Sequence, residues 1–214
     1  MGRRKKEPPG AHRAAIAKAA ERLFAQKGME ATSMDEIAKA AGYSKATLYV
    51  YFQSKEELVG LLVLESMQKL HRCLCRALEQ PNSIRAKYDL LCRALVQYQQ
   101  EFPFYFGLVL RQINIDFDAG ACLPEEVETF QVGERINGAI RSFLEQGMAE
   151  GALRPGLCIV PTIFAFWGML AGLVQTASNK EAYILREMKQ TKAEFLQYGF
   201  DLLYRSIQSG KEQP

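Results

Sequence analysis

Apolar residues recur every three or four positions along most of the chain, which is the spacing of α-helices that each bury one face. This spacing predicts one helix that ends at Gly28 and a long helix that begins after Ser54 and runs until Pro81. It predicts further helices at about 83–101, 103–117, 124–149, 157–177 and 190–208. No stretch alternates apolar and polar residues as a half-buried strand does. The pattern therefore predicts an all-α protein.

Residues 32–52 predict two short helices joined by a tight turn. Ser33 is a residue type that caps helix amino termini, and the carboxylate of Glu36 can reach back to that cap. Gly42 can adopt the positive φ that ends a helix, and Ser44 can cap the helix that follows. Two short helices around a turn of about four residues have the layout of a helix-turn-helix DNA reader.

The second of these helices is expected to have two different faces. Ala46 and Leu48 are predicted to face inward together with Phe52. The outer side then holds small, polar and basic side chains, namely Lys45, Thr47 and Tyr49. Such side chains can approach base edges or bond phosphates in a major groove. A plain surface helix is the alternative, but the caps, the turn glycine and the basic face all agree with a DNA reader.

The residue types in this block follow the pattern of a known family, with Thr32, Ile37 and Ala38, Ala41 and Gly42, Ser44, Leu48 and Tyr49, Tyr51 and Phe52, and Lys55. The block resembles the DNA-binding domain of TetR-family transcriptional regulators. Two positions depart from the family pattern, because Ala46 stands where many members have Gly and Tyr51 where many have His. The resemblance implies a three-helix DNA-binding domain at residues 11–53, joined by a long helix to an effector-binding and dimerisation body at residues 54–214.

The expected partner of this domain is a double-stranded DNA operator. Lys55 lies in the first turn of the long helix, where the resemblance favours contact with a phosphate. The motif and the resemblance together give a set of expected DNA-binding residues: Thr32, Ser33, Ser44, Lys45, Thr47, Tyr49, Tyr51 and Lys55.

Charge is distributed unevenly along the chain. The 214 residues carry a net charge of +3, whereas residues 1–55 hold 11 Lys or Arg against 5 Asp or Glu. A basic amino-terminal quarter attached to a mildly acidic body suits a protein that meets phosphate at one end. Residues 1–10, MGRRKKEPPG, predict a basic flexible arm that either contacts DNA or is a solvated tail.

The sequence contains no recognisable catalytic or metal-binding constellation. Its histidines, His12 and His71, do not pair with a nucleophile or with a second metal ligand at a known spacing. The five cysteines are an odd number without a CxxC pair, and no secretory segment precedes them. We therefore expect no catalysis, no metal and no cofactor, with reduced thiols in a cytoplasmic protein.

Aromatic residues gather at residues 102–106. Aromatic rings can line a pocket between helices, while a few polar groups orient the ligand. Ordinary core packing is the alternative for such a cluster. The expected effector pocket consists of Tyr98, Phe102, Tyr105, Phe106, Arg111, Phe166 and Trp167.

The most apolar stretch of the chain is residues 158–174. Its 17 residues could barely cross a bilayer, and Pro161 and two glycines weaken that interpretation, so no membrane association is expected. Glycines four residues apart let two helices approach closely. The resemblance implies that this helix and the last one form a homodimer interface, with Gly168, Gly172, Phe195, Gly199, Leu202 and Leu203 as its residues.

The resemblance implies a homodimeric repressor that a small, largely apolar effector releases from its operator. The alternative is a DNA-binding dimer whose body binds no small ligand and serves as a protein-interaction scaffold. The sequence is compatible with activation as well as with repression.

Overall fold

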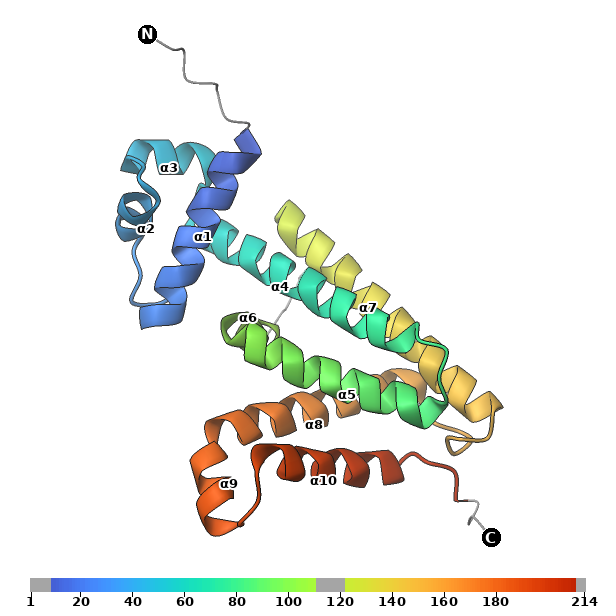
Figure 1. The fold of residues 1–214 in the computed structure, drawn as a ribbon. Coiled ribbons are helices and arrows are strands. Elements are labelled where there is room, and N and C mark those ends of the chain that lie inside the picture. The colour runs from blue at the N-terminus through green and yellow to red at the C-terminus, as the bar shows by residue number, and fades with distance from the viewer. Residues whose placement is uncertain (1–8, 111–121, 211–214) are drawn as a thin grey trace. The chain divides into compact units, whose positions relative to one another are not determined.

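The computed structural model describes residues 9–110 and 122–210, and ten α-helices lie within these ranges (Figure 1). Their bounds are α1 Pro9–Lys27, α2 Met34–Ala41, α3 Lys45–Tyr51, α4 Lys55–Leu78, α5 Ile84–Glu101, α6 Pro103–Val109, α7 Pro124–Ala149, α8 Ile159–Asn179, α9 Glu181–Glu187 and α10 Lys192–Arg205. The described residues contain no β-strand, although Leu153 and Gln208 form an isolated antiparallel bridge. The prediction of an all-α protein is confirmed.

Most of the predicted helices are observed, and two predictions differ from the structure. The helix predicted at residues 103–117 is seen as α6, which ends at Val109, and residues 111–117 of that prediction lie outside the described residues. The short helix α9 was not predicted. Lys180 leaves the helical conformation, with φ −115° and ψ 17°, and separates α8 from α9. No proline or glycine marks this break in the sequence.

The chain divides into two compact units. The first unit comprises the described parts of Met1–Ser66 and Gly107–Phe130, and the second comprises Met67–Phe106 and the described part of Gln131–Pro214. Residues 54–66 and the first turns of α7 therefore belong to the unit that contains α1, α2 and α3.

The first unit is built on a small apolar core between α1, α2 and α3 (Figure 1). Ile16 from α1, Ile37 from α2 and Leu48 from α3 are completely buried in it. Phe52, directly after α3, and Leu58 in α4 are also completely buried. These residues occupy the inner positions that helical spacing predicts, so the sequence pattern identifies this core.

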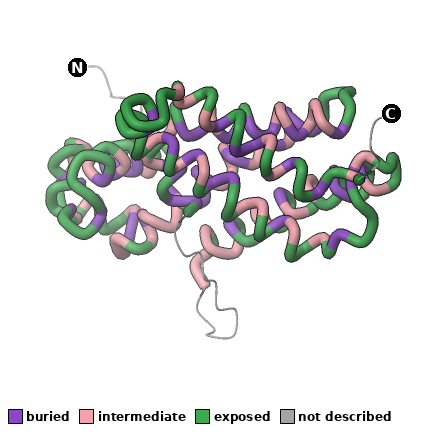
Figure 2. The backbone as a smooth tube through the Cα atoms, turned by 90° about the horizontal axis from the view of Figure 1, so that it is seen from below, coloured by how far each residue is buried: buried purple, intermediate pink, exposed green. Residues whose placement is uncertain are grey.

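The second unit packs α8 against α5 and α10 (Figure 1). Tyr88 is buried in α5, and its hydroxyl donates a 2.9 Å hydrogen bond to the carbonyl of Phe200 in α10. The side-chain amide of Gln99 donates a 2.9 Å hydrogen bond to the hydroxyl of Ser178 in α8. Figure 2 shows buried positions interspersed with exposed ones along the helices, as expected of helices that each cover one face.

Among the helices in the described ranges, α8 alone is long and apolar enough to span a membrane by length and composition. The core helix of a soluble protein passes the same test. Ile163, Leu170 and Val174 are buried on one side of α8, whereas Phe164 and Met169 are exposed. This helix thus has one covered face and one apolar face open to a further partner.

Candidate functional site

Helix α2 is defined at both ends by local hydrogen bonds. The hydroxyl of Ser33 accepts a hydrogen bond from the backbone N–H of Glu36, and the Glu36 carboxylate accepts one from the backbone N–H of Ser33 at 2.9 Å. Gly42 ends the helix with φ 78°, in the left-handed region that glycine tolerates. The predicted capping box and turn glycine are confirmed.

Helix α3 is the short helix that would enter a groove. The hydroxyl of Ser44 accepts a hydrogen bond from the backbone N–H of Thr47 at 3.1 Å and shares a 2.8 Å hydrogen bond with the Thr47 hydroxyl. This cap fixes the start of the helix, as predicted from the sequence. Leu48 anchors the inner side in the core.

The outer side of α3 differs from the prediction at one residue. Ala46, predicted to face inward, is exposed. Counted from Leu48 at about 100° per residue, Ala46 lies about 160° away from the core direction. Val50 lies at the corresponding angle on the other side of this outward line, and 74% of its surface is exposed. The sequence analysis overlooked Val50, although the helical phase set by Leu48 would have identified it.

Lys45 and Tyr49 lie on one side of α3, about 60° and 100° away from Leu48. The Lys45 ammonium forms a 2.8 Å ion pair with Asp35 of α2, and both side chains are 61% exposed. The hydrogen bond to Asp35 raises the pKa of Lys45 above its ordinary value. Tyr49 is 37% exposed. Lys45 therefore stays charged and accessible, and a DNA phosphate would compete with Asp35 for it.

Two of the predicted DNA-binding residues hold the loop between α1 and α2. Thr32 is buried, and its hydroxyl donates a 2.8 Å hydrogen bond to the carbonyl of Gly28. The Lys55 ammonium donates to the carbonyls of Met29, at 3.0 Å, and Thr32, at 3.4 Å. These contacts position the start of α2 for any role that the two side chains have in DNA binding.

Arg13 in α1 joins three parts of the first unit, a role that the sequence analysis did not predict. Its guanidinium donates to the carbonyl of Tyr51 at 2.7 Å, to the Glu57 carboxylate at 3.1 Å and to the Glu125 carboxylate at 2.8 Å. It also lies over the ring of Phe52, 4.4 Å from the ring centroid. The three acceptors belong to the last residue of α3, the first turn of α4 and the first turn of α7. Arg13 is therefore placed to hold the end of α3.

Tyr51, which was predicted to bind DNA, lies next to His12. The ring centroids of His12 and Tyr51 are 5.5 Å apart, and Nδ1 of His12 is 2.7 Å from the Tyr43 hydroxyl. These aromatic side chains connect α1 with the residues just before and at the end of α3. Tyr51 thus supports the position of α3 from within the chain.

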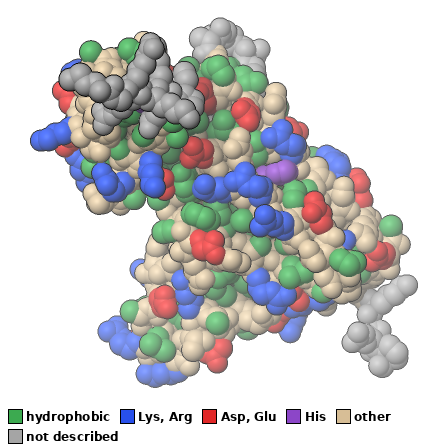
Figure 3. Space-filling model, turned by 45° about the horizontal axis from the view of Figure 1, so that its top comes forward, with side chains coloured by type: hydrophobic (Ala, Val, Ile, Leu, Met, Phe, Trp, Pro, Cys, Tyr) green, Lys and Arg blue, Asp and Glu red, His purple; other side chains and the backbone are tan. Residues whose placement is uncertain are grey.

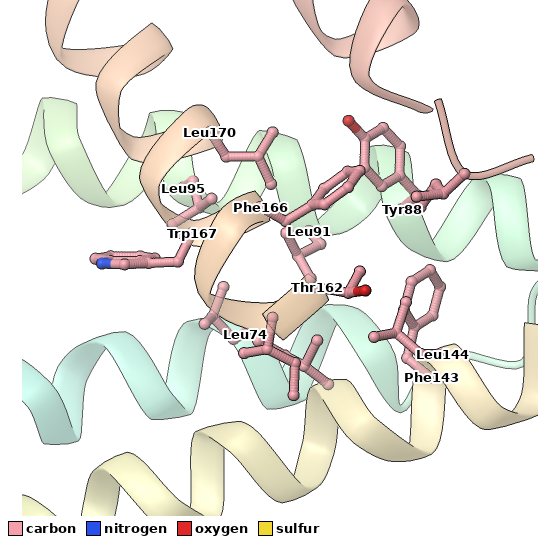
Figure 4. Close-up of a pocket in the computed structure, with 13 residues that line it drawn as sticks. Leu74, Tyr88, Leu91, Leu95, Phe143, Leu144, Thr162, Phe166, Trp167 and Leu170 are labelled. Atoms are coloured by element: carbon pink, nitrogen blue, oxygen red, sulfur yellow. The ribbon is translucent and has the colours of Figure 1, made fainter. Parts of the chain in front are cut away.

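A small apolar cavity of about 50 Å³ lies in the second unit (Figure 4). Its lining includes Phe166 and Trp167, two of the residues predicted for an effector pocket. Figure 4 shows the Phe166 ring directed toward Tyr88 and the Trp167 ring extending the other way. The remaining lining residues come from α4, α5, α7 and α8 and from the segment after α10: Leu74, Leu91, Leu95, Ile140, Phe143, Leu144, Thr162, Ile163, Leu170 and Ile207.

The other residues predicted for the pocket form a separate aromatic cluster. Tyr98, Tyr105 and Phe106 are buried, and the rings of Tyr98 and Phe106 are 6.1 Å apart. The Lys69 ammonium lies 5.5 Å from the ring centroid of Phe102 and 5.1 Å from that of Tyr105. Arg111 lies outside the described residues. The cluster supplies core packing with one cation beside its rings.

The residues predicted for the dimer interface occupy two different environments. Gly168 and Gly172 in α8 are exposed, and a Cβ at either position would meet no atom within 4 Å. In α10, Leu202 is 56% exposed, and Phe195 and Leu203 are half-buried. Gly199, by contrast, is buried, and a Cβ there would lie 2.9 Å from Cδ1 of Leu173 and closer still to Cδ2. Gly199 thus permits close packing of α10 on α8 within one chain.

Charged groups do not form a metal site in the part of the chain that the structure describes, where no group of three or more His, Cys, Asp or Glu is suitably placed. None of the five cysteines forms a disulfide, and Sγ of Cys75 lies 3.3 Å from Nε2 of His71. Figure 3 shows Lys and Arg side chains interspersed with acidic ones over the face in view. On this face the basic side chains therefore do not form one continuous patch.

Comparisons of the sequence and the fold with known proteins point to transcriptional regulators. The family model for bacterial regulatory proteins of the tetR family matches residues 16–62. The chain is 28% identical over 141 residues to the HTH-type transcriptional regulator YhgD of Bacillus subtilis, covering 65% of this chain and 71% of that protein. It is 39% identical over 84 residues to the regulator TtgR of Pseudomonas putida, covering 39% of this chain and 40% of that protein.

A solved structure of AibR, in complex with isovaleryl coenzyme A and operator DNA, has a similar fold, with a TM-score of 0.66 and 20% sequence identity. The alignment covers 90% of this chain and 98% of AibR. Over residues 16–62 the chain therefore resembles the tetR family of bacterial regulatory proteins. YhgD and TtgR are HTH-type transcriptional regulators by name.

Proposed function

We propose that this chain is a homodimeric repressor that binds a double-stranded DNA operator through α3 and releases it when a small, largely apolar effector binds the second unit. The observation that carries the proposal is the outer side of α3. This side exposes Lys45, Tyr49 and Val50 on a helix whose start is fixed by a Ser44 cap and whose inner side is anchored by Leu48. Such a helix can enter a major groove.

The predicted DNA-binding residues divide into two roles. Lys45, Thr47, Tyr49 and the Ser33 and Ser44 caps face the operator, with Lys45 exchanging Asp35 for a phosphate. Thr32, Tyr51 and Lys55 act mainly by holding the loop before α2 and the end of α3, because their side chains already have contacts within the chain.

The exposed apolar surface of α8 and α10 supports a homodimer. Gly168 and Gly172 leave room for a second helix, and Phe164, Tyr198 and Leu202 offer apolar area next to them. Two copies would place two α3 helices on one operator, and about 34 Å between them fits successive major grooves. Substituting Leu202→Glu should convert the dimer to a monomer in analytical ultracentrifugation and abolish operator binding.

The effector site proposed here is the apolar cavity beside Phe166 and Trp167. Its volume of about 50 Å³ holds only a very small molecule as it stands. A larger effector would have to displace the Phe166 and Trp167 rings. AibR, a neighbour in fold, was solved with an acyl coenzyme A and operator DNA, which supports effector control in this architecture. We place the regulator in the cytoplasm, where its operator is.

For the operator experiment, an operator is first selected from a pool of random duplexes. Binding of the protein to the labelled operator and to labelled random DNA is then measured by fluorescence anisotropy over a salt series. Specific binding that weakens steeply with salt is expected, because phosphate contacts release counterions. Tyr49→Ala should lose specific binding while keeping the fold. Equal affinity of the wild type for the selected operator and for random DNA, or equal affinity of the wild type and Tyr49→Ala for the selected operator, would contradict DNA recognition through α3.

The effector experiment uses Trp167, the single tryptophan of the chain, as its own reporter. Small apolar compounds that enter the cavity should change Trp167 fluorescence and raise the dissociation constant for the operator. A compound that changes fluorescence but leaves operator binding unchanged would bind without acting as an effector.

The small cavity volume and the buried Tyr98, Tyr105 and Phe106 cluster favour one second candidate, a DNA-binding dimer whose body binds no ligand and serves as a protein-interaction scaffold. A ligand screen in which no compound alters either Trp167 fluorescence or operator affinity would favour this scaffold.

A further inference from the structure

The outermost surface of α3 is apolar, although the residues around it are polar or basic. Val50 is 74% exposed, more than any other large apolar side chain among the described residues. Ala46, one helical turn before it, is exposed as well. An exposed apolar pair on a helix that enters a groove indicates what that helix meets there.

The helical phase places these two residues deepest in a groove. Leu48 is completely buried and defines the inward direction. At about 100° per residue, Ala46 and Val50 each point about 160° away from Leu48, whereas Thr47 and Tyr49 point about 100° away. Ala46 and Val50 would therefore lie deepest in the groove, with Thr47 on one side of them and Tyr49 on the other.

The major groove offers one apolar group to such a pair. The edges of guanine, cytosine and adenine present hydrogen-bond donors and acceptors there, and thymine alone adds a C5-methyl group. A valine side chain facing a guanine or cytosine edge would desolvate polar atoms without bonding them. Phosphates need donors, which Lys45 supplies and Val50 does not.

On these grounds we propose that Val50, together with Ala46, is a specificity-determining contact that reads the C5-methyl group of a thymine in each half of the operator. This proposal rests on the proposed DNA-binding function. It names the base that the recognition helix selects. Binding to the DNA backbone is assigned to Lys45 and its neighbours.

The test removes the methyl group from the DNA instead of altering the protein alone. Each thymidine of the selected operator is replaced, one at a time, by deoxyuridine, which differs from thymidine only by the absence of that methyl group. Loss of one buried methyl should weaken binding of the wild type by about fourfold, and by about fifteenfold when both half-sites are changed.

Val50→Ala is the matched protein variant. It should bind the thymine operator more weakly than the wild type and show a smaller difference between thymine and uracil operators, because only the Ala46 part of the contact remains. Val50→Thr, which keeps the shape and replaces a methyl with a hydroxyl, should also lose much of the discrimination. Lys45→Ala should keep the thymine preference and reduce the slope of affinity against salt.

The outcomes separate this proposal from the proposed function. If the wild type binds the operator specifically and no deoxyuridine substitution weakens this binding, the methyl contact is overturned. The proposed DNA binding through α3 then still stands. A uracil penalty that persists unchanged in Val50→Ala assigns the methyl to another residue and also overturns the proposal. If the wild type shows no specific DNA binding, the proposed DNA-binding function itself is overturned.

Discussion

The two units of the chain are stabilised by different means. In the first unit, single polar contacts define the functional part: Ser33 and Ser44 cap two short helices, Gly42 turns the chain, and Arg13 holds the end of α3. In the second unit, long helices pack apolar faces, as where Gly199 lets α10 approach Leu173. In the proposed function, a short helix that presents one face to DNA needs fixed ends, whereas a ligand-binding body needs faces that can repack.

The difference in means predicts different sensitivities to substitution. Short helices gain little stability from their own hydrogen bonds, so they depend on their anchors. Long packed helices spread their stability over many contacts and are damaged mainly by loss or excess of volume.

The largest effect should come from the anchor of α3. Leu48→Ala removes a completely buried side chain and is expected to cost about 2–5 kcal/mol. Hydrogen exchange should show lost protection in α2 and α3, with α5, α8 and α10 still protected. Val50→Ala, on the exposed side of the same helix, is the control and should change stability by less than about 0.5 kcal/mol. Uniform loss of protection in both units would show that the chain unfolds as one body.

Two glycines on neighbouring helices test packing in the second unit. Gly199→Ala should lower the free energy of unfolding relative to Gly172→Ala in urea, because its new Cβ overlaps the Leu173 side chain, which must shift. Gly172→Ala meets open space within the chain and should stabilise α8 by about 0.5–1 kcal/mol. If Gly172 lies in the proposed dimer interface, this variant should also dissociate more readily in ultracentrifugation. Equal unfolding free energies for the two variants would contradict the close approach at Gly199.

Arg13→Ala tests whether one polar residue positions α3 for DNA binding. The guanidinium is 34% exposed, so screening reduces its three contacts to about 1–2 kcal/mol of stability. We expect operator affinity to fall, because Arg13 holds the end of α3 through the carbonyl of Tyr51. Glu125→Gln, which removes one ion pair and keeps the other two contacts, should lie between the wild type and Arg13→Ala. An unchanged operator affinity in Arg13→Ala would limit Arg13 to a structural role.

The smallest effect concerns the pH dependence of the α2 cap. The hydrogen bond from Lys27, followed by those from Ser33, lowers the pKa of Glu36 from 4.5 to about 2. Since the folded-state pKa lies below the unfolded value, the carboxylate stabilises the fold above pH 4.5, and this contribution is lost as the pH falls toward 2. The wild type should therefore lose more stability than Glu36→Gln over this interval in urea unfolding followed by circular dichroism. Parallel pH profiles would exclude a contribution from Glu36.

The sequence alone identified the all-α class, the two short helices with their caps and the buried Leu48. These features are encoded by neighbours within three or four residues, so local spacing is enough to recognise them. The same local reasoning placed Ala46 inward and overlooked Val50, because it divided α3 into two faces before fixing the helical phase at Leu48.

Other properties were decided only by the tertiary structure. The partners of Arg13 lie 38, 44 and 112 residues away along the chain, and no local pattern connects them. Phe166 and Trp167 line a cavity whose walls come from several helices, whereas Tyr98 and Phe106 pack elsewhere. Gly199 is buried and Gly172 is open, although both are helical glycines among apolar residues. Local hydrogen bonds can be recognised from sequence, but which apolar faces meet depends on how distant helices pack, and that is fixed only when the chain folds.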